Sequence, residues 1–521
     1  MAVVVDADRH DLCRSHRRQE LELRERHQLA DALEAAEGPA AHQLGAASGD
    51  DRGGGAAVEA DAGDAHVASP RATSRIVAPR GDGGSPRGWR APAVAGEGAV
   101  PPCYDAVRLR PGRTRVRGAP TLLEVYNSLS GRKEEFWPLE DRVVRMYVCG
   151  ITPYDVGHLG HARVFVFFDT VRRYFEFNAY RVRHVQNITD VDDDMVRVSQ
   201  RLGLTIAELT ERNQQLYLQE MDALNVQRPD LFPKASEHID GMIALVQALL
   251  RSGHAYGVDG YVFFDTATTP RFGALAGHDR EGLRHVRNDS MPQEPEELKR
   301  DALDFLLWQP SEQAGAAFDS PWGRGRPGWH IECSAMVHAA LGDRIDIHGG
   351  GSDLRYPHHD SEIVQSECAT GAAPYVSLWM HIGTELLEGV KMSKSLGNLV
   401  KVSELLVRGH TPDGIRLYLL GTPYREQQDF SPAALSQWEQ RAATLARAAA
   451  AAGGPPDRLR VQPLRNEFTA AMDDGFDTPR AIAALLRIAD GVERQRLAGE
   501  TAVPALLELA GVLGLRLGRE G

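Results

Sequence analysis

The chain has 521 residues, a formal net charge of −13, 42% hydrophobic residues and 25% charged residues. This composition is typical of a globular protein of about two to four domains, and its acidic balance argues against a domain built mainly to bind nucleic acid. We find no apolar stretch of membrane-spanning length and no signal peptide with a charged start and an apolar middle. The five cysteines are sparse and odd in number, which favours a reducing environment, so we expect a cytoplasmic protein with no membrane partner.

The first segment, residues 1 to about 118, differs from the rest of the chain. It is rich in Ala, Gly, Arg and Asp, as in the run Asp50–Gly55, and it has few aromatic residues and no sustained apolar period. Such a segment cannot bury enough apolar surface to fold, so we predict a disordered extension at 1–118.

Strand-like and helical runs alternate between residues 119 and 432, which predicts a catalytic region with an α/β fold. The strand-like runs are Val143–Val148, Arg183–Gln186 and Arg344–His348, and the helical runs are Ala162–Tyr174, Ile239–Arg251 and Thr411–Leu420. Alternation of this kind indicates a Rossmann-like, doubly wound parallel sheet that binds a nucleotide at the carboxyl ends of its strands. Residues 195 to 325 look like an insertion domain.

The last part of the chain, 433–521, is rich in Ala, Leu and Arg. Leu435–Ala452 and Pro479–Arg494 have helical patterns, and Gly453–Pro456 ends the first of them. We therefore expect a C-terminal α-helical bundle after the catalytic region.

A first chemical motif, His158-Leu159-Gly160-His161, follows the first strand and a turn-rich segment. The order of strand, turn and helix start places backbone N–H groups and the positive end of the helix dipole where an anion can bind. Imidazoles such as His158 and His161 can donate hydrogen bonds to phosphate oxygens, and Gly160 allows a nucleotide close to the backbone. A lone H-x-x-H is more often incidental or a metal pair, so the motif needs a partner.

That partner is Lys391-Met392-Ser393-Lys394-Ser395, which puts two ammonium groups and two hydroxyls on one short segment without an acid. Lysine is a mobile point charge that binds phosphate well, whereas an arbitrary K-x-x-K is usually a solvated basic loop. Gly389 and Gly397 flank the segment and would let it close on a nucleotide.

Potential metal ligands are scattered along the chain. Cys149 ends the first strand, Cys333 lies far downstream, and His358 and Glu362 are spaced to share one face of a helix starting at Pro357. Two thiolates, one imidazole and one carboxylate are a plausible tetrahedral zinc set. Spacing alone does not join the two cysteines, because no C-x-x-C links them and a single buried cysteine is normally an inert small hydrophobe.

Together these motifs resemble the HIGH and KMSKS signatures of class I aminoacyl-tRNA synthetases, with Leu159 in place of the usual isoleucine. From about Leu122 to the C-terminus the chain resembles the cysteinyl-tRNA synthetase family. The segments that carry this resemblance are Tyr126–Leu129, Asn187–Asp193, His348–Leu354, Trp379–His381 and Met472–Pro479. One departure is Asp194, where the family often has lysine. Family enzymes begin near Leu122, so the long N-terminal extension is either an over-extended gene start, which we favour, or an appendage.

The resemblance implies a function and a set of site residues. It implies one Zn²⁺ held by Cys149, Cys333, His358 and Glu362, and ATP accompanied by Mg²⁺ at His158, Gly160, His161, Lys391, Ser393 and Lys394. It further implies that Thr189, Trp329, His330 and Asp353 hold the ammonium and carboxylate of L-cysteine. The expected reaction is activation of cysteine to cysteinyl-adenylate, followed by transfer to tRNA(Cys), and we expect the enzyme to be a monomer.

Alternatives stay open at this stage. The family usually continues past a segment like Gly511–Leu515 into a small anticodon-recognising domain, but this chain stops at Gly521. A related ligase, which joins cysteine to glucosaminyl-inositol in mycothiol synthesis, lacks that domain. A non-catalytic RNA- or cysteine-binding paralogue and a purely structural zinc site are more remote.

Overall fold

The computed structural model describes residues 123–155, 157–286, 294–393, 396–451, 458–494 and 499–518. The chain divides into two units, Met1–Gly84 and Ser85–Gly521, and every described residue belongs to the second. The predicted disordered extension at 1–118 therefore lies outside the described residues, as does the Gly453–Pro456 helix stop.

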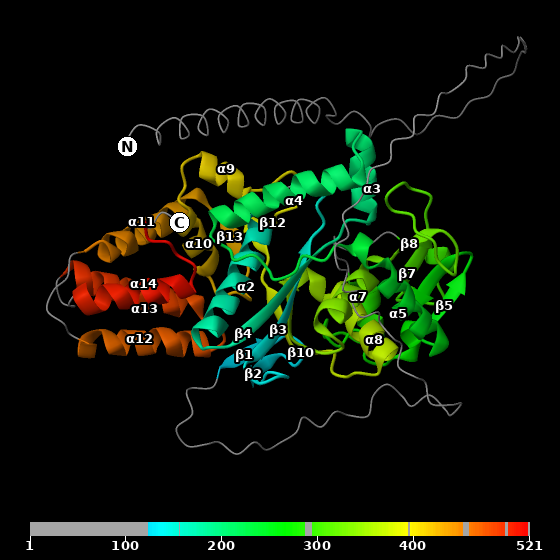
Figure 1. The fold of residues 1–521 in the computed structure, drawn as a ribbon, viewed down its shortest axis with the longest axis horizontal. Coiled ribbons are helices and arrows are strands. Elements are labelled where there is room, and N and C mark those ends of the chain that lie inside the picture. Colours follow the sequence, from blue (N-terminus) through cyan, green and yellow to red (C-terminus); the bar gives the residue numbers. More distant parts are fainter. Residues whose placement is uncertain are drawn as a thin grey trace, which may run out of the picture. The chain divides into compact units, whose positions relative to one another are not determined.

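The described residues form mixed helices and strands (Figure 1). The strands are β1 (Glu124–Asn127), β2 (Arg132–Glu135), β3 (Val143–Ile151), β4 (Arg181–Ile188), β5 (Ala255–Val258), β6 (Tyr261–Phe264), β7 (Phe305–Pro310), β8 (Gly325–Pro327), β9 (Ile345–Gly351), β10 (Val376–Ile382), β11 (Glu385–Leu387), β12 (Val390–Lys391) and β13 (Gln428–Phe430). The α-helices are α2 (Leu159–Phe177), α3 (Asp193–Leu202), α4 (Ile206–Ala223), α5 (Ile239–Arg251), α6 (Arg280–His285), α7 (Trp329–Leu341), α8 (His358–Thr370), α9 (Val402–Val407), α10 (Pro412–Leu420), α11 (Pro432–Ala449), α12 (Arg458–Asp473), α13 (Thr478–Glu493) and α14 (Gly499–Val512). Short 3₁₀ turns include η1 (Ala235–Glu237) and η4 (Ser352–Arg355).

The central sheet has the strand order β10-β9-β3-β4, and all its neighbours run parallel. Strand β3 is buried on both faces: Met146 and Val148 join the core that contains α2, whereas Tyr147 and Cys149 join the core that contains α5, α7 and α8. This alternation follows from the two-residue period of a strand. Helices thus cover both faces of a parallel sheet, and the predicted doubly wound fold is confirmed (Figure 1).

The predicted elements are present, with shifted ends. Strand β3 continues past Cys149 to Ile151, because an irregularity after Val148 lets Ile151 pair with Ile188 of β4. Cys149 therefore lies inside the strand and does not end it. Helix α8 begins at His358, and Pro357 is its N-cap instead of its first helical residue.

The region predicted as an insertion contains an antiparallel sheet, β5-β6-β7-β8, together with α3, α4, α5 and α6. Helix α5 packs on α7 and α8, so this part of the region shares a core with the central sheet. The exact insertion bounds at 195–325, like the other domain bounds, stay predictions.

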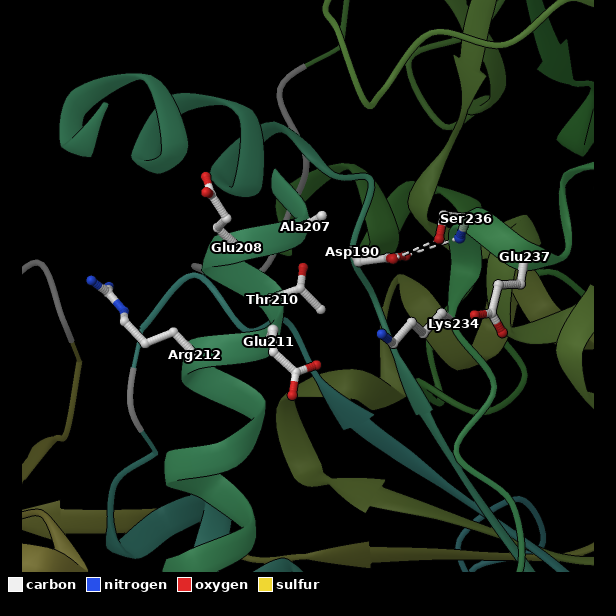
Figure 2. Close-up of a pocket in the computed structure, with 9 residues that line it drawn as sticks. All are labelled: Asp190, Ala207, Glu208, Thr210, Glu211, Arg212, Lys234, Ser236 and Glu237. Carbon is white, nitrogen blue, oxygen red and sulfur yellow. Dashed lines mark hydrogen bonds between the residues drawn. The ribbon is translucent and has the colours of Figure 1, made fainter. Parts of the chain in front are cut away.

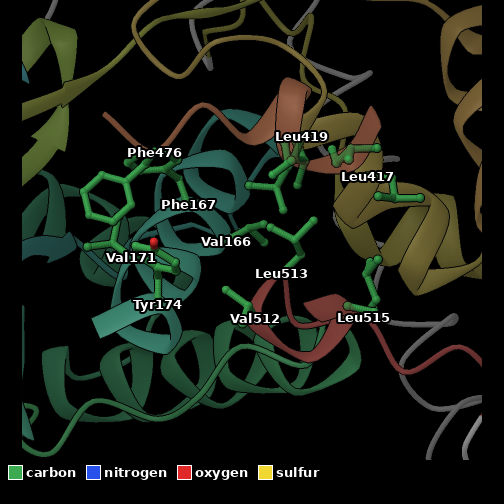
Figure 3. Close-up of a cluster of buried hydrophobic side chains, with 14 of the residues drawn as sticks. Val166, Phe167, Val171, Tyr174, Leu417, Leu419, Phe476, Val512, Leu513 and Leu515 are labelled. Carbon is green, nitrogen blue, oxygen red and sulfur yellow. The ribbon is translucent and has the colours of Figure 1, made fainter. Parts of the chain in front are cut away.

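The C-terminal helices α11 to α14 pack against one another, and α10 and α14 also contact α2. Figure 3 shows Val512, Leu513 and Leu515 beside Leu417 and Val166, in one continuous hydrophobic cluster. A buried ion pair joins Arg416 to Asp169 at 2.6 Å, and the Arg416 guanidinium also donates to the carbonyls of Leu513 and Leu224. The predicted helical bundle is therefore attached to the catalytic region through shared core. Within the described ranges, every helix is too short or too polar to cross a membrane.

Candidate active site

The four predicted metal ligands come together at the carboxyl end of the central sheet. Cys149 comes from β3, Cys333 from α7, and His358 and Glu362 from successive turns of α8. The Cys149 Sγ atom lies 4.0 Å from Cys333 Sγ and 4.0 Å from Glu362 Oε1, and His358 Nε2 lies 3.2 Å from that same oxygen. All four donor atoms lie within 4.8 Å of one another, and all four residues are buried. Two sulfurs, one imidazole nitrogen and one carboxylate oxygen match the donors that zinc prefers.

Burial controls the protonation of this cluster. It raises the pKa of the Cys149 thiol, with a further rise from the Cys333 sulfur, and it raises the pKa of Glu362, again with Cys333 adding to the effect. Burial also lowers the pKa of His358 well below its usual value. In a dry site, negative donors need a compensating charge, which a divalent cation supplies. The Tyr375 hydroxyl donates to Glu362 Oε2 at 3.3 Å and so orients the carboxylate.

A layer of histidines surrounds the cluster, and the sequence reasoning assigned no metal-site role to most of it. The Nε2 atoms of His348 and His359 lie 3.5 and 3.2 Å from Cys149 Sγ. The His359 Nδ1 atom lies 2.8 Å from His381 Nε2, and the Nδ1 atoms of His330 and His358 lie 2.9 Å apart. Burial lowers the pKa of His348 and of His330 to about 3, so these rings are neutral at pH 7. The signal in the sequence was the histidines of His348-Gly349, His358-His359 and Met380-His381, which lie in β9, at the start of α8 and in β10.

The predicted amino-acid pocket is brought together only in part. The Trp329 ring stacks on His358, with centroids 4.2 Å apart, and His330 contacts the same imidazole, so both residues lie beside the metal-donor cluster. The Thr189 hydroxyl accepts a hydrogen bond from Asn187 Nδ2 at 3.1 Å, just beyond the end of β4. Asp353, in η4, instead pairs with Lys391.

The His158–His161 motif forms the N-terminus of α2. The Nδ1 atom of His158 accepts from the backbone N–H of Gly160 at 3.0 Å, and Nδ1 of His161 accepts from the N–H of His158 at 3.3 Å. A neutral imidazole that accepts at Nδ1 carries its proton on Nε2, so both rings have an Nε2–H to donate. A Cβ at Gly160 would lie 2.7 Å from the His158 ring, so a larger residue would displace this ring.

The lysine segment begins in β12, where Lys391 pairs with Leu386 of β11, so the hairpin positions its first residue. Asn398 fixes the first part of the segment: its Nδ2 donates to the Lys391 carbonyl at 3.1 Å, and its Oδ1 accepts from the Ser393 N–H at 2.9 Å. The Lys391 ammonium lies 3.3 Å from Asp353 Oδ2, and both side chains are about one-third exposed (35% and 36%). Lys394 lies outside the described residues.

A buried network connects the two motifs that the sequence predicts to bind phosphate. Arg163, on the first turns of α2, donates to the carbonyls of Gly383 and Pro423 and lies 3.6 Å from the Glu385 carboxylate of β11. The Tyr418 hydroxyl donates to Glu385 at 2.6 Å. Burial raises the pKa of Glu385 to about 7, against the opposing effects of Tyr418 and Arg163. The network fixes the helix of the histidine motif against the strand that leads to the lysine segment.

A separate pocket of about 700 Å³ lies between α4 and η1 (Figure 2). Its lining mixes acidic and basic side chains and contains none of the predicted site residues: Asp190, Ala207, Glu208, Thr210, Glu211, Arg212, Lys234, Ser236 and Glu237. Figure 2 shows the Asp190 carboxylate turned toward Ser236, whose N–H and hydroxyl donate to it at 2.9 and 2.6 Å. Because this carboxylate caps η1, we assign the pocket no part in the chemistry.

The fold and the two motifs define a class of protein. Residues 135–440 match the family model of the class I (C) tRNA synthetase catalytic domain, and residues 467–518 match the DALR domain. The fold is similar to Mycobacterium tuberculosis methionyl-tRNA synthetase in complex with methionyl-adenylate (TM-score 0.51, 15% identity, covering 71% of this chain and 89% of that one). It is equally similar to the Agrobacterium radiobacter K84 agnB2 LeuRS-tRNA-LeuAMS complex (TM-score 0.51, 11% identity, 73% and 86%). The chain is thus a class I aminoacyl-tRNA synthetase.

Sequence relatives identify the member of this class. The chain is 46% identical to the cysteine–tRNA ligase of Alkalilimnicola ehrlichii over 404 residues, which are 76% of this chain and 86% of the relative. It is 43% identical to the same enzyme of Halorhodospira halophila and 40% identical to that of Dehalococcoides mccartyi, with 85% and 86% of those relatives covered. The chain belongs to the cysteine–tRNA ligase family.

Proposed function

We propose that this enzyme activates L-cysteine with ATP, releases pyrophosphate, and transfers the cysteinyl group to the 3′ end of tRNA(Cys). The observation that carries this proposal is a buried cluster of two sulfurs, an imidazole and a carboxylate at the same sheet edge as the His158–His161 motif. A nucleotide binds at this edge in doubly wound folds. The cluster can recognise a thiol, and the histidine motif can hold phosphates.

The metal we propose for the cluster is Zn²⁺, held by Cys149, Cys333, His358 and Glu362. When bound, zinc prefers a substrate thiolate over the hard, high-pKa hydroxyl of serine, which distinguishes the two amino acids without an editing site. Mg²⁺ would enter with ATP. The Trp329 ring, stacked on His358, would form one wall of the space for the amino acid.

The remaining chemistry is positioning and charge stabilisation. The substrate carboxylate is already ionised at neutral pH, so its attack on the α-phosphorus needs no general base. The Nε2–H groups of His158 and His161 would donate to phosphate oxygens from the start of α2. Lys391 and Lys394 would neutralise the charge that develops on pyrophosphate, with Ser393 beside them. Thr189, His330 and Asp353 are our candidates for holding the amino acid's ammonium and carboxylate.

The acceptor distinguishes this proposal from the amino-sugar alternative, which the relatives do not favour. Purified enzyme is given ATP and radiolabelled cysteine with either total tRNA or glucosaminyl-inositol. We expect label on tRNA, sensitive to mild base as an ester is, and no ligated amide. An amide without tRNA charging would overturn the assignment of the acceptor. Absence of cysteine-dependent ATP–pyrophosphate exchange would overturn the activation step itself.

A further inference from the structure

We propose that helix α10 is a positioning element for the reaction with ATP. It sets the place of the lysine segment relative to the histidine motif, and Arg416 and Tyr418 are its two positioning residues. The inference rests on the proposed function in one respect, namely that the two motifs bind ATP. It adds that the part of the chain that follows α14 helps to place them.

Tyr418 connects α10 to the strands beside the lysine segment. Its hydroxyl donates to the Glu385 carboxylate of β11 at 2.6 Å, and its carbonyl accepts from Gln428 Nε2 of β13 at 2.9 Å. The backbone of Glu385 continues the connection, because its carbonyl accepts from the N–H of Met392 at 3.3 Å. Two hydrogen bonds on either side of Glu385 therefore join α10 to the second residue of the lysine segment.

Arg416 connects another side of α10 to the helix that begins with the histidine motif. Residues two positions apart do not share a helix face, so Arg416 and Tyr418 leave α10 in different directions. The Arg416 guanidinium is fully buried and pairs with Asp169 of α2 at 2.6 Å. It also donates to the carbonyls of Leu224 and Leu513. Helix α2 has no proline to bend it, so the hold at Asp169 also determines where its first turn lies.

The segment that follows α14, residues 513–517, completes the hold on α10. Asp413, in the first turn of α10, accepts hydrogen bonds from two successive N–H groups of this segment at 3.0 and 2.8 Å. Gly514 leaves room for the Arg416 side chain: it has a φ of +71°, and a Cβ at this position would overlap the guanidinium. A larger residue at Gly514 would therefore displace Arg416 and, through it, disturb the hold on α2.

The metal-donor cluster, by contrast, is built from other elements. It comes from β3, α7 and α8, whereas α10 packs mainly on α2, α11 and α13. A displaced α10 should therefore change how the phosphates are held and leave the binding of cysteine as it is. Because misplacement of a catalytic group slows the reaction itself, the expected signature is a lower kcat with an unchanged KM for cysteine.

The first test is Tyr418→Phe, which removes one hydroxyl and keeps the buried ring. We expect the kcat of cysteine-dependent ATP–pyrophosphate exchange to fall about tenfold, as a displacement of a catalytic group by less than about 1 Å would cause, with KM for cysteine unchanged. Tyr424→Phe is the matched control, because Tyr424 is also buried and its hydroxyl has no hydrogen-bond partner among the described residues. This control should keep the kcat of the unmodified enzyme. Equal kcat values in the two variants would overturn the role of Tyr418.

The second test compares Gly514→Ala with Gly518→Ala. Both glycines have a positive φ, +71° and +78°, so alanine strains the backbone similarly at the two positions. A new Cβ would overlap Arg416 at Gly514, whereas at Gly518 it would meet no described atom within 4 Å. We expect Gly514→Ala to lower kcat about fivefold and Gly518→Ala to leave it unchanged. Equal effects would mean that backbone strain alone is responsible and would overturn the role of Arg416.

Loss of folded protein would imitate these results, so each rate is divided by the concentration of active sites, measured from the burst of cysteinyl-adenylate formation. A purely structural role lowers the number of active sites and leaves kcat per site unchanged, and that result would overturn the proposal. A lower kcat per site with normal zinc content supports it.

The double variant tests whether the two residues act through one element. If both act through α10, Tyr418→Phe combined with Gly514→Ala should reduce kcat by less than the product of the two single effects. A full product would overturn α10 as their common link. An unmodified enzyme without cysteine-dependent exchange would instead overturn the proposed function, on which this inference rests.

Discussion

The two halves of the candidate site are built in opposite ways. The metal-donor cluster and its histidines are almost completely buried and come from β3, β9, β10, α7 and α8, which form the core. The lysine segment starts from a short hairpin, its first ammonium is about one-third exposed, and its described contacts include one asparagine and one ion pair.

The buried cluster suits recognition of the amino acid, whereas the more exposed lysine segment suits catalysis. A buried, rigid cluster can compare a thiol with a hydroxyl because its donors do not adapt to the wrong substrate. Phosphate binding instead needs groups that can adjust as charge moves during the reaction, and a partly exposed lysine such as Lys391 can do this. Changes in the cluster should therefore abolish metal binding and cysteine selection, whereas changes in the loop should slow the reaction and leave selection intact.

The largest effect is expected from Cys149→Ser. This residue is one of the four proposed zinc ligands, so its loss should lower zinc affinity by roughly 100-fold and reduce cysteine-dependent ATP–pyrophosphate exchange in parallel. Metal content by mass spectrometry and exchange kinetics measure both. Cys368→Ser is the control, because Cys368 is a buried cysteine of α8 that lies outside the cluster. This variant should keep its metal and its activity. Equal metal content in the two variants would contradict the cluster assignment.

The next effect is expected from Lys394→Ala, which removes one charge of the lysine segment. Exchange should fall roughly tenfold or more, while zinc content and the preference for cysteine over serine stay unchanged. Lys401→Ala, just beyond the segment, is the matched control and should have little effect. Unchanged exchange in Lys394→Ala would remove this segment from the catalytic machinery.

The network between the two motifs predicts a pH effect on stability. Because burial raises the pKa of Glu385 from 4.5 to about 7, the folded state holds a proton there that the unfolded state releases. The resulting stabilisation is present below about pH 4.5 and is lost as the pH rises through 7. Glu385→Gln should therefore gain about 1 to 3 kcal/mol relative to the unmodified enzyme between pH 5 and pH 8. Thermal unfolding of both proteins across this range checks the prediction, and a constant difference would contradict it.

The smallest effect concerns Asp194, the departure from the family pattern. It lies in the first turn of α3 and pairs with Arg197 at 2.5 Å, and both side chains are well exposed. Asp194→Lys should cost about 0.5 kcal/mol, because it reverses the charge at the positive end of the helix dipole and removes the exposed ion pair. Activity should not change. A large loss of tRNA charging with normal cysteine activation would show a role in the acceptor step.

The fold was predictable from the sequence for two reasons. The hydrophobic patterns of its strands and helices alternate along the chain, and the His158–His161 motif precedes the Lys391–Ser395 segment as it does in the family. The ends of elements were not, since the pairing of Ile151 with Ile188 extended β3, and Pro357 is the N-cap of α8 and not its first helical residue. The four proposed metal ligands came from resemblance, because Cys149 and Cys333 meet only through tertiary structure.

The histidine layer was harder to foresee. His348, His359 and His381 lie on three different elements, and only the parallel register of β9 and β10 and the turn of α8 bring their rings together. Likewise, nothing near Arg163 in the sequence indicates Glu385, because the ion pair depends on how α2 packs on β11.

The most direct test of metal-based recognition is the absorption spectrum of the Co²⁺-substituted enzyme during titration with cysteine or serine. We expect cysteine to change the sulfur-to-cobalt charge-transfer bands with saturation at one equivalent, and serine at the same concentration to leave them unchanged. The same response to both amino acids, or none to cysteine, would contradict it.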